Sequence, residues 1–147
     1  MVPDRAAIFI DGGYFDFVIR EELQKARLDY GKLSAKLSTG SNLLRTYYYH
    51  CMPYQSSKPT AAEAERYSHM RSFVHMLNKQ TRFEVRLGEL AFRGVDKDGQ
   101  PIFEQKRVDI LLGVDMVLLA AKQQITKAVL VAGDSDFLPA VEVAKKE

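Results

Sequence analysis

The sequence predicts an α/β protein, a three-layer α/β/α sandwich in which helices cover both faces of a mainly parallel central sheet. Residues 6–10 and 128–132 are short, uninterrupted apolar runs, which are typical of parallel strands covered on both faces. Between these two runs, segments with the apolar spacing of a helix alternate with further strand-like segments. That alternation indicates right-handed crossovers in a parallel sheet.

The first third of the chain supplies two strands separated by helical segments. The strand at residues 6–10 ends at a Gly-Gly pair, and residues 14–28 then place apolar side chains at three- and four-residue spacing. Residues 32–37 fit a short helical turn. Residues 43–52 are rich in tyrosine and leucine and form the second predicted strand.

A long helix and a hairpin follow. Thr60 with Glu63 three residues later matches a capping box, which predicts that a helix begins at residue 61 and continues to residue 79. In residues 83–92, apolar and polar side chains alternate sufficiently to predict one strand. The dipeptide Asp98-Gly99 then predicts a tight hairpin turn, because Gly tolerates the positive φ that such turns require.

The last third of the chain returns to the sheet. Residues 109–122 are strongly apolar and helical, residues 127–132 form a buried strand, and residues 137–146 begin a helix. A helix of this kind normally leads to one more strand. We therefore expect a single domain over residues 1–147 whose sheet is one strand short, or a piece of a longer protein that continues into a final strand.

Composition narrows the classes of function. A chain of 147 residues is long enough for one buried core, and its net charge of +2 is too small for a generally basic nucleic-acid binder. The single Cys51 excludes an internal disulfide. No apolar stretch approaches the length of a membrane span, and the N-terminus lacks a signal-peptide pattern. We expect a cytoplasmic protein without a membrane partner.

Aspartates follow the predicted strands at the ends where an α/β sheet carries its chemistry. Asp11 ends the first apolar run, and Asp134-Ser135-Asp136 ends the last one. Asp109 and Asp115 lie at the start and in the middle of the intervening apolar helix. Several carboxylates without matching bases favour a divalent cation, because hard cations prefer oxygen ligands.

Each of these acids also has a structural interpretation. Asp11, Asp109 and the 134–136 segment can each cap a helix. Asp115 lies within an apolar run and must reach solvent, a basic partner or a metal, because an unpaired buried carboxylate is costly. Six residues on a helix separate Asp109 and Asp115 by about 120° around the axis, so both can serve one site only if Asp109 lies at the helix end.

Other catalytic equipment is absent from the sequence. It has no phosphate-binding P-loop, no complete dinucleotide fingerprint and no GxSxG elbow. The three histidines do not have a zinc-binding spacing and are interpreted as structural. The tyrosines of residues 47–49, with Tyr54, either stack on bases or face the core.

A cluster of acids requires a neutralising cation, since mutual repulsion otherwise raises their pKa values and destabilises the fold. Mg²⁺ or Mn²⁺ would activate a water and stabilise charge on a phosphate oxygen, which makes phosphodiester hydrolysis the natural reaction. Lys106 and Arg107, beside Asp109, are the best placed cations to hold a polyanion.

Three segments resemble the NYN domain of the PIN-like nuclease superfamily, which includes the LabA-like proteins. They are IFIDG at residues 8–12, QKRVDI at residues 105–110 continuing to Asp115, and VAGDSDFLP at residues 131–139. They occur in the family's order and span nearly the whole chain. Tyr14 stands where many NYN domains have Asn, and Arg107 replaces the Gly of the usual KGVD motif.

The resemblance implies a PIN-like, Rossmann-type fold and a metal-dependent ribonuclease site. It assigns Asp11, Asp109 and Asp134 as principal ligands of Mg²⁺ or Mn²⁺, with Asp115 and Asp136 as supporting catalytic acids. Lys106, Arg107 and Ser135 are expected to contact substrate. The expected partner is single-stranded or structured RNA, and PIN-like relatives also suggest a homodimer.

The leading hypothesis is therefore an endoribonuclease. A PIN-like module that binds RNA or protein without cleaving is the alternative from a different class. A metal-dependent phosphatase for small molecules is a third interpretation of the same carboxylates.

Overall fold

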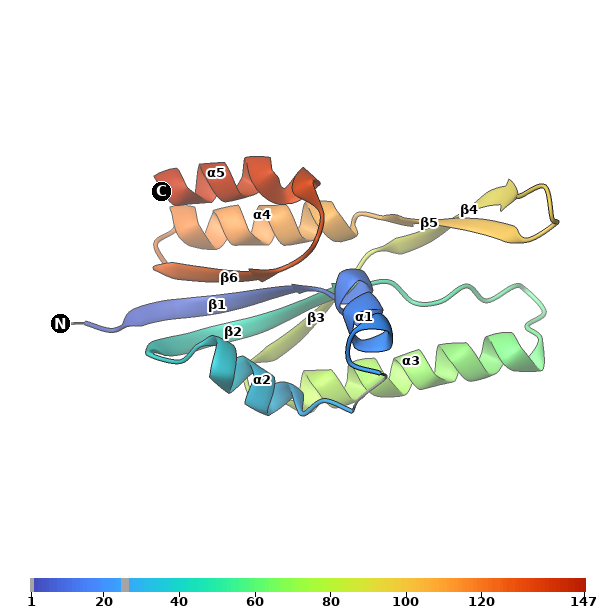
Figure 1. The fold of residues 1–147 in the computed structure, drawn as a ribbon, viewed down its shortest axis with the longest axis horizontal. Helices are drawn as coiled ribbons and strands as arrows, with labels where there is room; N and C mark the ends of the chain where they lie inside the picture. The colour runs from blue at the N-terminus through green and yellow to red at the C-terminus, as the bar shows by residue number, and fades with distance from the viewer. Residues whose placement is uncertain (1, 25–26) are drawn as a thin grey trace.

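The computed structural model describes residues 2–24 and 27–147 and has the predicted three layers (Figure 1). In chain order the elements are β1 (Asp4–Asp11), α1 (Gly12–Glu21), α2 (Tyr30–Leu37), β2 (Ser41–His50), α3 (Ala61–Lys79), β3 (Phe83–Leu87), β4 (Glu89–Val95), β5 (Pro101–Lys106), α4 (Val108–Ala121), β6 (Lys127–Val131), the 3₁₀ turn η1 (Ser135–Phe137) and α5 (Leu138–Lys146).

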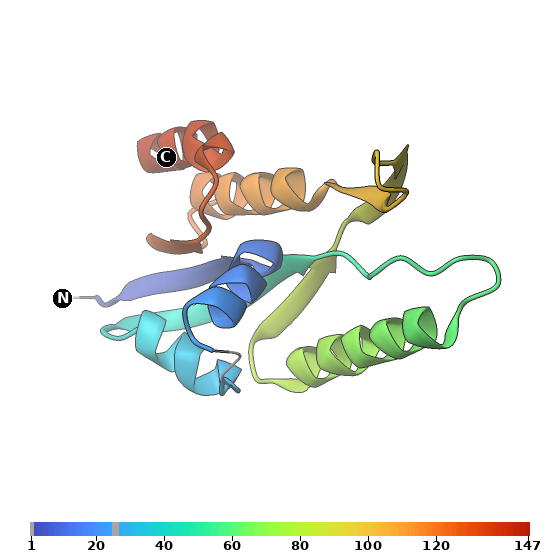
Figure 2. The same ribbon diagram turned by 45° about the vertical axis from the view of Figure 1, so that its right-hand side comes forward.

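The central sheet is parallel throughout, with strand order β3-β2-β1-β6. Helices α4 and α5 lie on one side of it, and α1, α2 and α3 lie on the other (Figures 1 and 2). The predicted α/β/α sandwich with a parallel sheet is thus confirmed. Among the described residues, no helix combines the length and the apolar character needed to cross a bilayer.

The first strand lies at the centre of both cores. Residues 6–10 are completely buried, as their uninterrupted apolar character predicts. Ala7 and Phe9 point to the core under α4, whereas Ile8 and Ile10 point to the core under α1 and α3. This alternation follows from the two-residue period of a strand. Strand β1 ends at Asp11.

The long helix α3 has the predicted bounds, but its capping box is only half formed. Thr60 Oγ1 accepts a hydrogen bond from the Glu63 backbone N–H at 3.1 Å. The Glu63 carboxylate does not return to Thr60; it accepts bonds from the backbone N–H and the hydroxyl of Ser56 instead. These hydrogen bonds lower the pKa of Glu63, and they connect α3 to the segment that precedes it.

The prediction of one strand over residues 83–92 is wrong. The chain forms β3 in the central sheet, breaks at Gly88, and continues as β4 in a separate antiparallel pair with β5. A Cβ at Gly88 would overlap the carbonyl oxygen of Lys106, so the two backbones approach as closely as only glycine allows. The hairpin turn at Asp98-Gly99 is confirmed, with Gly99 at φ +75°.

Two helix ends also differ from the predictions. The helix predicted over residues 14–28 runs from Gly12 to Glu21, and residues 25–26 of that prediction lie outside the described residues. The last helix is preceded by the 3₁₀ turn η1. Within the described residues the central sheet has four strands, with β6 at its edge.

Candidate metal centre

The ends of β1 and β6 place two of the predicted acids at the same edge of the sheet. These strands are parallel neighbours, and Ile10 pairs with Val131. Asp11 is the last residue of β1, and Asp134 follows the end of β6 by three residues. Their proximity is a consequence of strand order, as expected for the carboxyl edge of a parallel sheet.

The β4–β5 hairpin delivers the third acid. Strand β5 ends at Lys106, Arg107 is the N-cap of α4, and Asp109 lies in the first turn of that helix. Arg107 adopts the left-handed conformation, with φ 72° and ψ −14°. This is a conformation that glycine adopts without strain, so the glycine of the KGVD motif suits this position and Arg107 is strained there.

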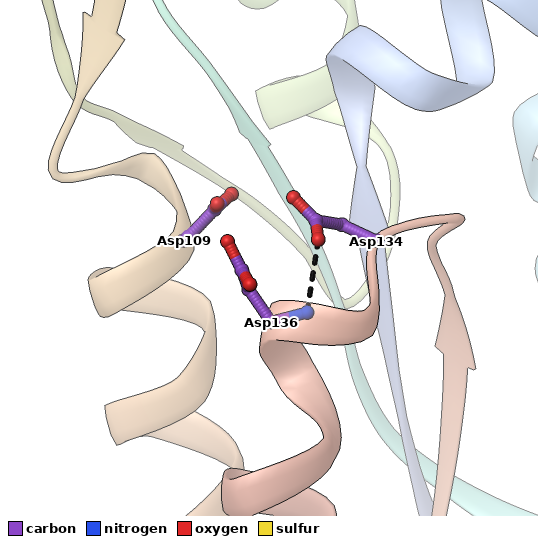
Figure 3. Close-up of side chains that lie close together, drawn as sticks. All are labelled: Asp109, Asp134 and Asp136. Atoms are coloured by element: carbon purple, nitrogen blue, oxygen red, sulfur yellow. Dashed lines mark hydrogen bonds between the residues drawn. The ribbon is translucent and has the colours of Figure 1, made fainter.

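Three carboxylates come together at this edge, those of Asp109, Asp134 and Asp136 (Figure 3). One oxygen from each lies within 4.8 Å of the others, and all three residues are exposed. The Asp136 backbone N–H donates to Asp134 Oδ1 at 2.9 Å, which holds the turn between β6 and α5 in the form that points both side chains at Asp109.

Asp11 lies beside this group with one oxygen already engaged. Its Oδ1 accepts hydrogen bonds from the N–H groups of Gly13 and Tyr14 at 3.1 and 3.3 Å, which caps α1 as the structural interpretation proposed. Among the described residues, Oδ2 has no hydrogen-bond donor. Burial raises the pKa of Asp11, the two N–H groups and His50 lower it, and the charge of Asp134 raises it.

Electrostatics connect all four acids. The pKa of Asp109 is raised by burial and then by the negative charges of Asp11, Asp134 and Asp136. None of the ion pairs formed by the described residues includes any of these carboxylates. Among the described residues, therefore, no ion pair offsets the repulsion among Asp109, Asp134 and Asp136, and the charge of His50 acts on Asp11.

This donor set fits a hard divalent cation. It offers only carboxylate oxygens, which lie within 4.8 Å of one another. Two Mg–O bonds of about 2.1 Å span at most about 4.2 Å between their oxygens, so the side chains would move closer together around a bound ion. It is also open to solvent, and Mg²⁺ usually keeps several waters in its shell. Two of the three predicted principal ligands, Asp109 and Asp134, belong to the group, and Asp136 rather than Asp11 is its third member.

The structure does not bring Asp115 to this group. Its carboxylate accepts a hydrogen bond from the Tyr49 hydroxyl at 2.9 Å and pairs with Arg86 Nε at 3.2 Å. Six residues of helix carry it about 9 Å along α4 from Asp109 and turn it to another side. The sequence left a basic partner as one of three ways to accommodate Asp115, and Arg86 is that partner. Together with the Tyr49 hydrogen bond, the ion pair connects α4 to β3 and β2.

The predicted substrate contacts have different surroundings. Lys106 and Arg107 are exposed beside Asp109, and Arg107 Nη1 donates to Glu89 Oε1 at 2.7 Å across the hairpin. The side chain of Ser135 lies outside the described part of the chain.

Sequence reasoning missed a histidine–aspartate pair at the same sheet edge. His50 Nε2 lies 2.7 Å from Asp16 Oδ2. Burial lowers the pKa of His50, but its interactions with Asp16 and Cys51 outweigh burial and raise that pKa to about 9. The resulting positive charge lowers the pKa of Asp11. The sequence signal that could have revealed this pair is the position of His50 near the end of the second predicted strand.

Tyr14 lies over the loop that carries Asp134. A Cβ at Gly133 would come within 2.5 Å of the Tyr14 ring, so this glycine lets the ring pack directly on the backbone. The residue that replaces the family's Asn thus supports the turn between β6 and the 134–136 segment.

The model of the NYN domain family matches residues 5–147. A crystal structure of a protein of unknown function from Vibrio parahaemolyticus has the same fold, with a TM-score of 0.65 at 21% identity over 99% of this chain and 76% of that one. No curated protein matches the sequence.

Proposed function

Because the chain belongs to the NYN domain family of the PIN-like nuclease superfamily, we propose that it is an endoribonuclease that uses Mg²⁺ or Mn²⁺ to hydrolyse phosphodiester bonds in RNA. The observation that carries the proposal is the group of three carboxylates, with oxygens within 4.8 Å of one another, at the carboxyl edge of the sheet.

Asp109, Asp134 and Asp136 would hold the ion. When bound, the metal lowers the pKa of a coordinated water and stabilises negative charge on a phosphate oxygen. The three side chains come from α4, the loop after β6 and η1. Their positions are set by backbone elements and by the Asp136–Asp134 hydrogen bond.

Asp11 is suited to accept a proton. Its Oδ1 is held by two backbone N–H groups, which fixes the direction of Oδ2. Burial keeps its pKa above the ordinary value, and a carboxylate with a raised pKa is a stronger base. We assign Asp11 the role of taking the proton from the attacking water.

The cations beside the site would hold the polyanion. Lys106 and Arg107 lie just before Asp109 in the chain and are exposed. Contacts of lysine and arginine with phosphates position a nucleic acid without reading its sequence. These two residues would therefore orient the strand, while the acidic group binds the scissile phosphate through the metal.

The test is cleavage of end-labelled single-stranded RNA in Mn²⁺ or in EDTA. We compare the wild-type chain with Asp109→Asn and Asp134→Asn. Glu142→Gln is the control, since it removes the same charge from an exposed position on α5. Loss of a metal ligand is expected to exceed the 10- to 100-fold effect typical of a supporting residue, so we expect a fall of more than about 100-fold.

Two results would contradict the proposal. Cleavage that persists in EDTA, or in both Asp→Asn variants, would show that the acidic group is not the catalytic centre. Binding of RNA without cleavage at any Mn²⁺ or Mg²⁺ concentration would instead support the PIN-like binding module.

A further inference from the structure

Three aromatic side chains meet on an arm that projects from the acidic edge of the sheet. Phe92 and Phe103 face each other across the β4–β5 hairpin, and Tyr54 comes from the segment between β2 and α3. Figures 1 and 2 show the hairpin and this segment extending together beyond the ends of β1 and β2. We call the three residues the aromatic arm site.

The rings are arranged in a way that leaves aromatic surface open. Phe103 is the most covered of the three and lies 4.8 Å from Tyr54 and 6.0 Å from Phe92 between ring centres. Phe92 is 55% exposed and Tyr54 is 39% exposed. Their rings lie 6.5 Å apart and are tilted by 30°. A flat ring between them would need about 7 Å, twice an ordinary carbon–carbon contact, so a base would stack on an exposed ring face and not between the two rings.

The arm aromatics differ from the strand tyrosines. Tyr48 and Tyr49 are completely buried, and Tyr47 stacks on Phe9 at 5.5 Å, so these tyrosines serve the core. A single exposed aromatic residue is ordinary, but a cluster of them marks an interaction site. The cluster lies outside both hydrophobic cores.

The arm leads directly to the candidate metal centre. From Phe103, three residues of strand reach Lys106, a path of about 10 Å. Arg107 and Asp109 follow at once. A nucleic-acid strand that stacks on the arm would therefore pass two cations before its backbone reaches the carboxylates, which is the combination of stacking and phosphate contacts typical of single-strand binding.

We propose that the aromatic arm site stacks an unpaired base of the RNA substrate, a few nucleotides from the bond that is cleaved. This inference rests on the proposed function and extends it, because it makes the enzyme selective for single-stranded regions. Bases within a duplex are already paired and stacked, so their faces cannot reach the rings.

A tryptophan reporter tests the stacking directly. The chain contains no Trp, so Phe92→Trp places the sole indole on the arm. We titrate this variant in EDTA, which prevents metal-dependent cleavage, with a single-stranded RNA oligomer and with a duplex of the same strand. We expect saturable fluorescence quenching by the single strand and none by the duplex. Absence of quenching by the single strand, or equal quenching by both, overturns the proposal.

Affinity measurements separate stacking from simple apolar contact. Phe92→Leu keeps an apolar side chain but removes the ring. We expect it to weaken binding of labelled single-stranded RNA by about 5- to 150-fold, the range that corresponds to one stacked base. The matched control is Phe17→Leu, which replaces an aromatic residue of α1 that is 49% exposed, and its affinity should equal that of the wild-type chain. Equal affinities for Phe92→Leu and the wild type would overturn the proposal.

A small substrate distinguishes failure of this inference from failure of the proposed function. Bis(p-nitrophenyl) phosphate is too short to reach from the arm to the carboxylates. If Mn²⁺ supports its hydrolysis but RNA does not quench the fluorescence of Phe92→Trp, the nuclease assignment stands and the stacking proposal fails. If RNA quenches but neither substrate is hydrolysed, the stacking site stands and the nuclease assignment fails.

Discussion

Replacing Asp109 with Asn should stabilise the metal-free protein, although it removes a residue of the candidate metal centre. One oxygen of each carboxylate lies within 4.8 Å of the others, and two unit charges at that separation repel by about 0.9 kcal/mol in water. The substitution removes two of the three pairs in the group, about 1.7 kcal/mol before screening, and salt reduces this further. The loss of a negative charge from the first turn of α4 costs about 0.3–1 kcal/mol.

The net expected gain is about 1 kcal/mol at low ionic strength, which raises the melting temperature by roughly 2–4 °C for a domain of this size. With saturating metal, the wild-type protein should instead be more stable than Asp109→Asn. Mn²⁺ at 100 times its dissociation constant adds about 2.7 kcal/mol to the wild-type stability. Asp109→Asn lacks one ligand and should gain much less.

The assay is thermal unfolding followed by circular dichroism in EDTA and in Mn²⁺. Glu142→Gln, which removes the same charge from the exposed surface of α5, should follow the wild type in both buffers to within about 0.5 kcal/mol. The reasoning is refuted if Asp109→Asn is less stable than the wild type in EDTA. It is also refuted if Mn²⁺ raises both melting temperatures equally.

Two further predictions follow from the pKa values and from the glycines. The raised pKa of Asp109 means that the folded protein binds this proton more tightly than the unfolded chain. The contribution of Asp109 to the stability of the metal-free protein should therefore rise as the pH falls through this raised pKa. Because protons compete for the metal ligands, calorimetry should also find weaker Mn²⁺ binding at about pH 5 than near neutrality. Gly88→Ala should lower the free energy of unfolding in urea by about 1–3 kcal/mol, because its Cβ overlaps the backbone of Lys106. Gly113→Ala, whose Cβ would lie 3.5 Å from that of Ala140, should instead raise it by up to about 1 kcal/mol; an unchanged Gly88→Ala would contradict the close approach.

The fold was predictable wherever the signal lies within a few neighbouring residues. The apolar run at residues 6–10 is long enough and continuous enough to identify a strand buried on both faces. Thr60 marks the start of α3 because a capping hydroxyl acts only on the next three residues. Glu63 shows the limit of such signals, since Ser56 competes successfully for its carboxylate.

The sequence alone determined that acids end the strands of a parallel sheet, because strand ends and Asp residues are both local features. Only the tertiary structure decided how the acids divide. Asp136 joins Asp109 and Asp134, whereas Asp115 is taken by Arg86 and Tyr49. The break at Gly88 and the meeting of Tyr54 with Phe92 also depend on contacts between distant segments. Local periodicity carries no information about those contacts, since packing of remote backbones, and not the preference of any single residue, sets which side chains can reach one another.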